Sequence, residues 1–217
     1  MLPAIFLLAL GIATFFNLLG NLKEHKLMTF ISKPLLAPFI IGFYVSSTPV
    51  VDPLIVLALV LGCAGDVFLL WRRVNPKAIV FGLLSFMIGH VFYIVSFSMS
   101  TGFFAAAQWW LVLGVVPYGI FAFLLFKMLE KDLGKMKGAV VVYSGILLAM
   151  SFFALSRVFV ASPASTLVTW LGSVLFIVSD TILALEYFRY KREILHHSLV
   201  MATYISAQLL IVVGLML

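Results

Sequence analysis

Charged residues and cysteine are scarce in this 217-residue sequence. Only 10% of the residues are charged and 64% are hydrophobic, whereas soluble domains average about 25% charged and about 45–50% apolar residues. This composition excludes a sizeable soluble domain. The single cysteine, Cys63, excludes an intramolecular disulfide and a cysteine-based metal site. We therefore expect an all-α polytopic membrane protein that forms a single domain over residues 1–217.

Apolar stretches separated by short polar segments predict eight transmembrane helices. We expect them at about 3–22, 28–46, 53–71, 78–99, 111–127, 138–155, 163–188 and 197–217. Pro117 is expected to kink the fifth helix. Trp109 and Trp110 should mark the outer membrane interface and Trp71 the inner one. The third helix of each half carries an aspartate, which hints at a weak four-plus-four tandem repeat of residues 1–100 and 101–217.

The basic residues predict the orientation of these helices. The sequence has 14 Lys and Arg residues, and 13 of them lie in or beside the loops after the first, third, fifth and seventh helices. Only Arg157 lies on the opposite side. Because cytoplasmic loops are rich in Lys and Arg, we expect both termini to be non-cytoplasmic, in a bacterial inner membrane. The net charge of +6 then reflects topology, so the expected partner is the lipid bilayer and not nucleic acid.

Two aspartates lie inside the predicted helices, Asp66 in the third and Asp180 in the seventh. An ionisable side chain at the centre of a membrane helix costs at least about 2.5–3.5 kcal/mol, so it is by default a functional candidate. The structural alternative is a buried ion pair, for which Lys33 in the second helix is the simplest partner. Two acids and one base leave one carboxyl group without a cation, and we interpret this as an acid–base arrangement.

Other polar side chains lie at the depth of these aspartates. A rise of about 1.5 Å per helical residue places most of them roughly 9–13 Å from the nearest cytoplasmic-side charge. Gln208 is one turn deeper, and His90 lies about 20 Å from Lys77. We interpret the set as one polar chamber that opens toward the cytoplasm. Its candidates for substrate binding are Lys33, Asn17, His90, Tyr143, Tyr204 and Gln208.

Several of these side chains also fit structural roles. Tyr143 and Asn17 could anchor an interface or join helices. Tyr204 and Gln208 could hydrogen-bond one helix to another, each bond contributing about 0.6 kcal/mol. His90 could be a hydrogen-bonded packing residue.

Three residues near the cytoplasmic end are expected to lie outside the chamber. Glu186 is close to Arg189 in the sequence and is expected at the interface. His196 and His197 are expected in solvent at the start of the last helix. Without a further ligand at suitable spacing they do not predict a metal site. Lys33 could extend its ammonium to the inner interface.

Five different short motifs are distributed over the predicted helices. They are Lys33-Pro34, Gly65-Asp66, Gly89-His90 with Tyr93, Ser179-Asp180, and Tyr204 with Gln208. Their order and spacing resemble the YhhN-like lysoplasmalogenase family over nearly the whole chain. The resemblance adds Tyr93 to the binding candidates. It implies hydrolysis of the vinyl ether bond of a lysoplasmalogen, which gives a fatty aldehyde and glycerophosphoethanolamine or glycerophosphocholine, without a cofactor.

The chemistry of a vinyl ether suits two carboxyl groups. Protonation of an alkene carbon gives an oxocarbenium ion that water captures, as in a glycosidase. Burial and mutual repulsion are expected to keep one of Asp66 and Asp180 protonated as the acid and the other ionised. Which residue takes which role stays open. Lys33 is expected to contact either the lipid phosphate, which we favour, or an aspartate.

Two other functions fit a buried aspartate pair. A proton-coupled transporter is the strongest non-enzyme alternative, and the hint of a tandem repeat favours it. An intramembrane aspartyl protease also uses two aspartates, but Cys63 stands where its Gly-x-Gly-Asp motif has glycine. A metal-dependent lipid hydrolase would need several histidines inside the bundle, where only His90 is found. Headgroup preference and oligomeric state stay open.

Overall fold

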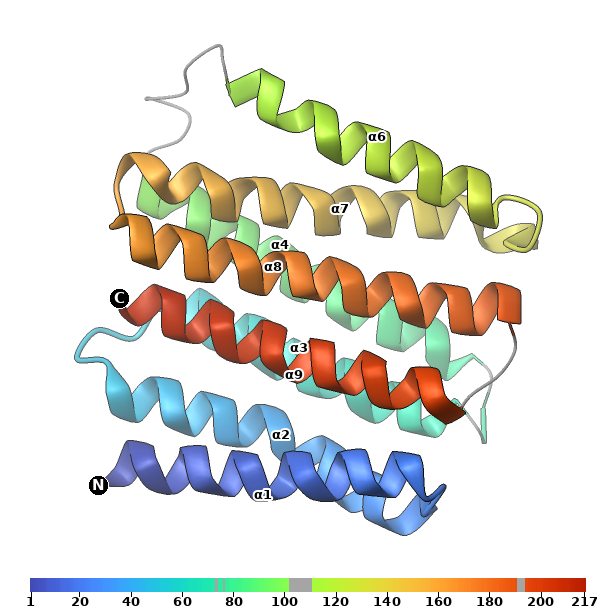
Figure 1. Ribbon diagram of the computed structural model, residues 1–217, viewed down its shortest axis with the longest axis horizontal. Coiled ribbons are helices and arrows are strands. Elements are labelled where there is room, and N and C mark those ends of the chain that lie inside the picture. The colour runs from blue at the N-terminus through green and yellow to red at the C-terminus, as the bar shows by residue number, and fades with distance from the viewer. Residues whose placement is uncertain (73, 76, 102–110, 191–193) are drawn as a thin grey trace.

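The computed structural model describes residues 1–72, 74–75, 77–101, 111–190 and 194–217 (Figure 1). Seven helices in this part of the chain are long and apolar enough to span a membrane. They are α1 (Leu2–Leu22), α2 (Lys26–Ser47), α3 (Pro53–Trp71), α4 (Ala78–Thr101), α7 (Lys137–Ser156), α8 (Pro163–Ala184) and α9 (Ile194–Met216). With the shorter apolar helix α6 (Leu111–Leu129) they make eight. The predicted all-α membrane fold is confirmed.

Three short helical segments extend two of these helices. η1 (Gly134–Met136) precedes α7 and η2 (Arg157–Phe159) follows it, both as 3₁₀ turns. η3 (Leu185–Tyr190) continues α8 as a π-helix, where the sequence predicts a regular helix to residue 188. A π-helical turn is wider than an α-helical one and is frequently found at functional sites. It changes the direction of the side chains that follow Ala184.

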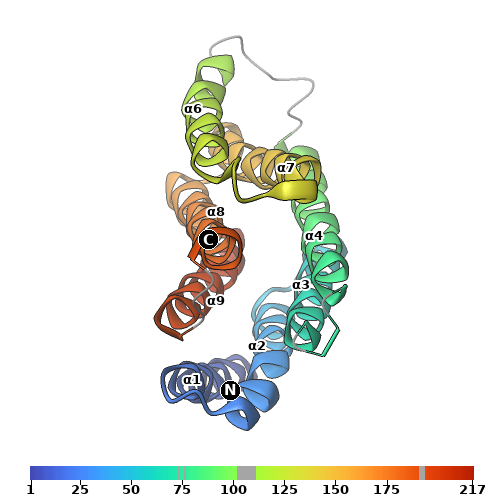
Figure 2. The same ribbon diagram turned by 90° about the vertical axis from the view of Figure 1, so that its right-hand side faces the viewer.

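Seven helices form a closed ring, seen almost end-on in Figure 2. Around this ring α1 packs on α2, then come α3, α4, α7, α8 and α9, and α9 returns to α1. The pair α3 and α4 therefore lies opposite the pair α8 and α9. α6 stands outside the ring, against α7 and η3. Side chains from opposite pairs of helices meet in the interior of the ring.

Glycines set the distance between α8 and α9. A Cβ atom on Gly172 would lie 2.9 Å from the carbonyl oxygen of Ala207. On Gly214 it would lie 2.5 Å from the backbone nitrogen of Thr169. Neither position has room for a side chain, and such close backbone contact is how membrane helices gain packing energy. The polar residues of α9 are thereby held at a fixed place relative to α8.

Turn residues begin the helices where the sequence predicts. Asp52 accepts a hydrogen bond from the Leu54 N–H at 2.8 Å, and Pro53 occupies the first turn of α3. Ser162 caps α8 in the same way, followed by Pro163. Side-chain acceptors and proline satisfy backbone donors that the first turn leaves free. These caps fix where α3 and α8 enter the bundle.

Both termini lie at one end of the bundle, and the last residues of α1, α3, α6 and α8 lie at the other (Figure 1). This arrangement agrees with the predicted number of helices and with the prediction that the basic loops share one side of the membrane. α2 and α9 begin two and three residues earlier than expected. Trp109 and Trp110 lie outside the described residues. Which end faces the cytoplasm, and the four-plus-four repeat, stay predictions.

Candidate active site

Asp66 and Lys33 form a buried ion pair between α3 and α2. The Lys33 Nζ atom lies 3.3 Å from Asp66 Oδ1, and 3% of each side chain is exposed. Lys33 therefore does not extend to the membrane interface. Of the two contacts predicted for it, the structure shows the aspartate, although the sequence favoured the lipid phosphate. The second carboxylate oxygen, Asp66 Oδ2, has no hydrogen-bond partner among the described residues.

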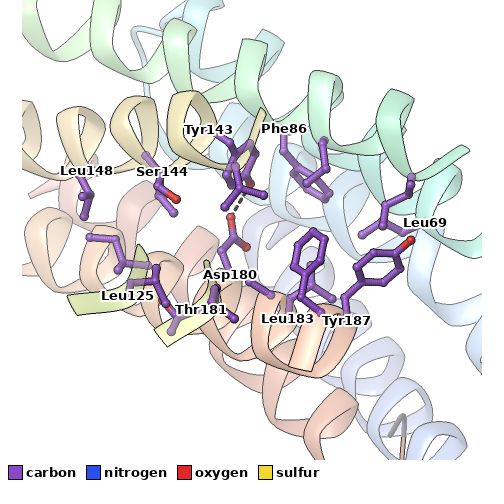
Figure 3. Close-up of a pocket in the computed structure, with 18 of the residues that line it drawn as sticks. Leu69, Phe86, Leu125, Tyr143, Ser144, Leu148, Asp180, Thr181, Leu183 and Tyr187 are labelled. Atoms are coloured by element: carbon purple, nitrogen blue, oxygen red, sulfur yellow. Dashed lines mark hydrogen bonds between the residues drawn. The ribbon is translucent and has the colours of Figure 1, made fainter. Parts of the chain in front are cut away.

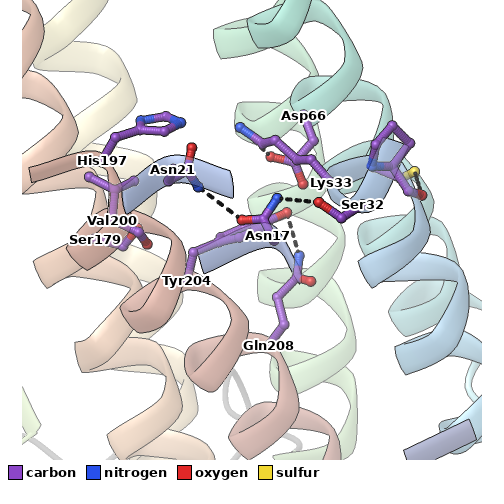
Figure 4. Close-up of polar contacts among 12 residues, drawn as sticks. Asn17, Asn21, Ser32, Lys33, Asp66, Ser179, His197, Val200, Tyr204 and Gln208 are labelled. Atoms are coloured by element: carbon purple, nitrogen blue, oxygen red, sulfur yellow. Dashed lines mark hydrogen bonds and ion pairs between the residues drawn. The ribbon is translucent and has the colours of Figure 1, made fainter. Parts of the chain in front are cut away.

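Side chains of α9 approach Asp66 from across the ring (Figure 4). Gln208 Nε2 donates to the Tyr204 hydroxyl at 2.8 Å, and Tyr204 interacts electrostatically with Asp66. Gly62 makes this approach possible, because a Cβ atom there would lie 2.9 Å from Gln208 Nε2 and 3.2 Å from the Tyr204 oxygen. The predicted grouping of Lys33, Asp66, Tyr204 and Gln208 is thus present in the structure.

Asn17 belongs to a ladder of polar side chains between α1 and α2 beside this group (Figure 4). It donates to Ser32 Oγ at 3.1 Å and accepts from Asn21 Nδ2 at 3.1 Å. Ser32 donates in turn to the Met28 carbonyl oxygen at 2.6 Å. Both ends of the Asn17 amide are engaged by helix-joining contacts, so its place in the structure fits the structural alternative. No contact of Asn17 with Asp66 or Asp180 is among those described.

Asp180 has different neighbours. The Tyr143 hydroxyl of α7 donates a hydrogen bond to Asp180 Oδ2. His90 Nε2 of α4 lies 3.4 Å from the Tyr143 oxygen and 3.9 Å from Asp180 Oδ2. The other ring nitrogen, His90 Nδ1, is buried, and the part of the chain that the structure describes offers it no hydrogen-bond partner. Three helices, α4, α7 and α8, thus place an imidazole, a phenol and an acid in one cluster.

Asp180 also lies on the wall of an apolar pocket, shown in Figure 3. The pocket is bounded by α3, α4, α6, α7, α8 and η3, and leucine, isoleucine, valine and phenylalanine make most of its wall. Tyr143, Ser144 and Thr181 lie near Asp180, while Arg72 and Tyr187 lie toward the end that carries the basic loops. The Asp180 side chain is 13% exposed. Such a pocket suits an alkyl chain that places a reactive group at one carboxyl.

Aromatic rings separate the surroundings of the two aspartates. The Tyr204 ring centroid lies 5.9 Å from that of Phe86 and 5.3 Å from that of Phe176. His90 packs edge-on against Phe176, with centroids 4.7 Å apart. Depth alone predicted a single polar chamber. The structure instead has two groups of polar side chains, one on each side of this aromatic layer. The two carboxyl groups still interact electrostatically.

Tyr93 lies one helical turn beyond His90, toward the end that carries the termini. It stacks on Phe97 with ring centroids 5.8 Å apart, and no described residue hydrogen-bonds its buried hydroxyl. Arg157 lies over the other side of the same region, with its guanidinium 5.8 Å from the Phe97 ring centroid. Only 8% of Arg157 is exposed, so this half of the bundle is less apolar than the sequence suggests.

Glu186 and His197 form a buried pair, which the sequence interpretation missed. Glu186 is 3% exposed, and its Oε2 atom lies 3.8 Å from His197 Nδ1. The expectation that Glu186 is interfacial is wrong, and so is the expectation that His197 is in solvent. The physical reason is the π-helix, because its wider turn directs Glu186 toward α9. The side chain of His196 lies outside the described part of the structure.

The bundle and its buried carboxyl groups define an integral membrane protein with a polar site inside an apolar ring. The chain belongs to the YhhN family, whose sequence profile matches residues 28–215. It is 34% identical over 155 residues to the human protein "Lysoplasmalogenase TMEM86B". That alignment covers 71% of this chain and 59% of the human protein, so the chain spans less than two thirds of its relative. No solved structure matches.

Proposed function

We propose that this chain hydrolyses the vinyl ether bond of lysoplasmalogens and releases a fatty aldehyde and a glycerophospho-base. The observation that carries the proposal is the Asp180 carboxyl on the wall of an apolar pocket. Membership of the YhhN family and the name of the human relative support the same activity. A substrate with one alkyl chain and a polar head fits a pocket that is apolar along its length and polar at one end.

The proposed reaction begins with transfer of a proton to the alkene carbon that is not bonded to oxygen. The resulting oxocarbenium ion is captured by water at the carbon that carries the ether oxygen. The hemiacetal then loses the glycerol oxygen as an alcohol, and the chain leaves as an aldehyde. The sum is addition of one water molecule, so no redox partner is needed. Carboxyl groups catalyse the related steps of glycoside hydrolysis in the same manner.

The surroundings of the two aspartates support different roles. Asp180 is the acid in this proposal, because it is the carboxyl group that lines the pocket. Tyr143 donates to Oδ2, which leaves Oδ1 to carry the transferred proton. Asp66, paired with Lys33, stays ionised and stabilises the cation from beyond the aromatic layer. Tyr204 and Gln208 belong to the group around Asp66, where they would orient that carboxylate.

Aldehyde release by the purified protein tests this proposal. We expect aldehyde from a 1-alkenyl lysophospholipid and none from the 1-alkyl ether or the 1-acyl ester with the same headgroup. In deuterium oxide, with the aldehyde reduced as it forms, the product should carry one deuterium on the carbon next to the former ether carbon. Absence of aldehyde from the 1-alkenyl lipid under these conditions would overturn the assignment. Accumulation of intact lipid across proteoliposomes would instead support a transporter.

A further inference from the structure

The apolar pocket has one basic residue, Arg72, on the part of its wall that the structure describes. Arg72 follows Leu69 by one turn on the same face of α3, and both line the pocket. Leu69 and Tyr187 lie at one end of the pocket and Leu148 lies at the other, with Asp180 between them (Figure 3). Leu69 is buried, Arg72 is half-buried and Tyr187 is exposed. Arg72 therefore stands where the pocket approaches the surface of the bundle.

The proposed reaction still lacks a contact for the phosphate of the substrate. The sequence favoured Lys33, but its ammonium pairs with Asp66, and Lys33 does not line the pocket. A lysophospholipid whose vinyl ether lies at Asp180 needs a cation farther along the same pocket. Arg72 has the fitting chemistry, because a guanidinium can donate two parallel hydrogen bonds to a phosphate.

The spacing along the pocket fits such a lipid. Tyr187, at the Arg72 end, follows Asp180 by seven residues, which is roughly 10 Å at the rise of a helix. In the lysolipid, six single bonds join the vinyl ether carbon to phosphorus, and they span roughly 7 Å when extended. The long side chain of arginine can cover the remaining distance. A vinyl ether at Asp180 therefore brings the phosphate within reach of Arg72, while the alkyl chain runs toward Leu148.

We propose that Arg72 binds the phosphate of the lysolipid at this end of the pocket, with the Tyr187 hydroxyl as a second donor, and that the amine of the headgroup stays in solvent. Asp180 is the only acidic residue on the described wall of the pocket, and it serves the reaction. That wall offers an amine no carboxylate of its own, so the site requires a phosphate and accepts ethanolamine and choline alike. The inference rests on the proposed hydrolysis, since it assigns the headgroup contact of that same substrate.

The test compares three 1-alkenyl substrates: a lysolipid with phosphoethanolamine, one with phosphocholine, and a 1-alkenylglycerol without a phosphate. The wild-type chain should have similar kcat/KM for the first two and a lower value for the third. Arg72→Met should lower kcat/KM for both phospholipids about 10–100-fold, mainly through KM, in line with loss of hydrogen bonds to a charged group. The value for the 1-alkenylglycerol should not change. Lys77→Met is the matched control, because it removes one positive charge between α3 and α4 at an exposed position outside the pocket.

Equal losses on all three substrates would show that Arg72 only supports the fold, and the subsite would be rejected. A wild-type preference of tenfold or more for one of the two bases would contradict an amine in solvent. Arg72→Gln keeps a polar side chain and covers the case in which Arg72→Met does not fold, and the same selective loss is expected.

Binding of the non-hydrolysable 1-alkyl analogues separates this inference from the proposed function. The phosphate should strengthen binding to the wild-type chain, and Arg72→Gln should remove most of that difference. An unchanged difference would reject the subsite. If the wild-type chain releases no aldehyde from any of the three 1-alkenyl substrates, it is the proposed function that fails, whereas the binding comparison still tests Arg72.

Discussion

The ammonium of Lys33 lies 3.3 Å from a carboxylate oxygen of Asp66, and only 3% of each side chain is exposed. Two charges removed from water in this way stabilise one another only as long as both are present. The pair also joins α2 to α3 in the layer that carries the proposed chemistry. This one contact is therefore expected to contribute both to stability and to the proposed catalysis.

Loss of Lys33 alone should be more damaging than loss of the pair. Lys33→Met should lower the free energy of unfolding by about 3–5 kcal/mol, because Asp66 is then buried without a cation. The double variant Lys33→Met/Asp66→Leu should recover most of that loss. Unfolding in mixed micelles measures both, with Lys131→Met, at an exposed position, as control. A double variant no more stable than the single one would contradict this account.

Each aspartate should be required for turnover, and Asp180, which has no described lysine or arginine partner, should not be required for the fold. Asp180→Asn and Asp66→Asn keep the size of the side chain and remove its acid–base function, so each should lower kcat at least about 10²-fold. Aldehyde release at saturating 1-alkenyl lipid is the measurement, with expression followed in parallel. Asp132→Asn, at an exposed position after α6, should match wild type. Near wild-type turnover in either buried variant would remove that residue from the mechanism.

Tyr143 should act through Asp180 and not through substrate affinity. Tyr143→Phe removes the hydroxyl that donates to Asp180 Oδ2, so kcat should fall about 10–100-fold while KM changes little. Tyr118→Phe is a matched control, because its hydroxyl bonds Ser151 Oγ and Trp170 Nε1 at 3.0 Å and does not line the pocket. A rise in KM at constant kcat would instead make Tyr143 a binding residue.

The pocket should limit the length of the alkyl chain. Leu148 lies on its wall, five residues beyond Tyr143 on α7, which is roughly 7.5 Å farther along the helix. Leu148→Trp should lower kcat/KM for an 18-carbon alkenyl chain about tenfold and spare an eight-carbon chain, since each buried methylene contributes about 0.8 kcal/mol. Val141→Trp, 51% exposed on α7 before substitution, should affect neither. Equal effects on both substrates would show that the alkyl chain of the lipid binds outside this pocket.

Hydropathy and loop charge were enough to predict the helices. The first residues of α3 and α8 follow from Asp52-Pro53 and Ser162-Pro163, where capping side chains and proline act locally. Depth along each helix was also predictable, because the rise per residue is fixed. This is why Lys33, Asp66, Tyr204 and Gln208 were grouped correctly from the sequence.

Rotation of the helices about their axes was not predictable from depth. Asp66 and Asp180 lie in similar layers, yet the rings of Phe86, Phe176 and Tyr204 pack between their surroundings. That arrangement depends on which helices are neighbours, and the contact of α4 with α7 skips α6 in the chain. Glu186 was misplaced for a related reason, since the sequence gives no signal for the π-helix that turns it inward.

The position of α6 outside the ring has a consequence for the proposed reaction. Phe121, Leu125 and Leu129 of this one helix form the outer wall of the pocket, and α6 packs mainly against α7 and η3. A lysolipid that moves past α6 arrives from the bilayer without crossing water, and the fatty aldehyde returns by the same way. The turnover rate would then follow the mole fraction of lysolipid in the membrane, and diluting the membrane with inert phospholipid would slow the reaction at constant bulk concentration.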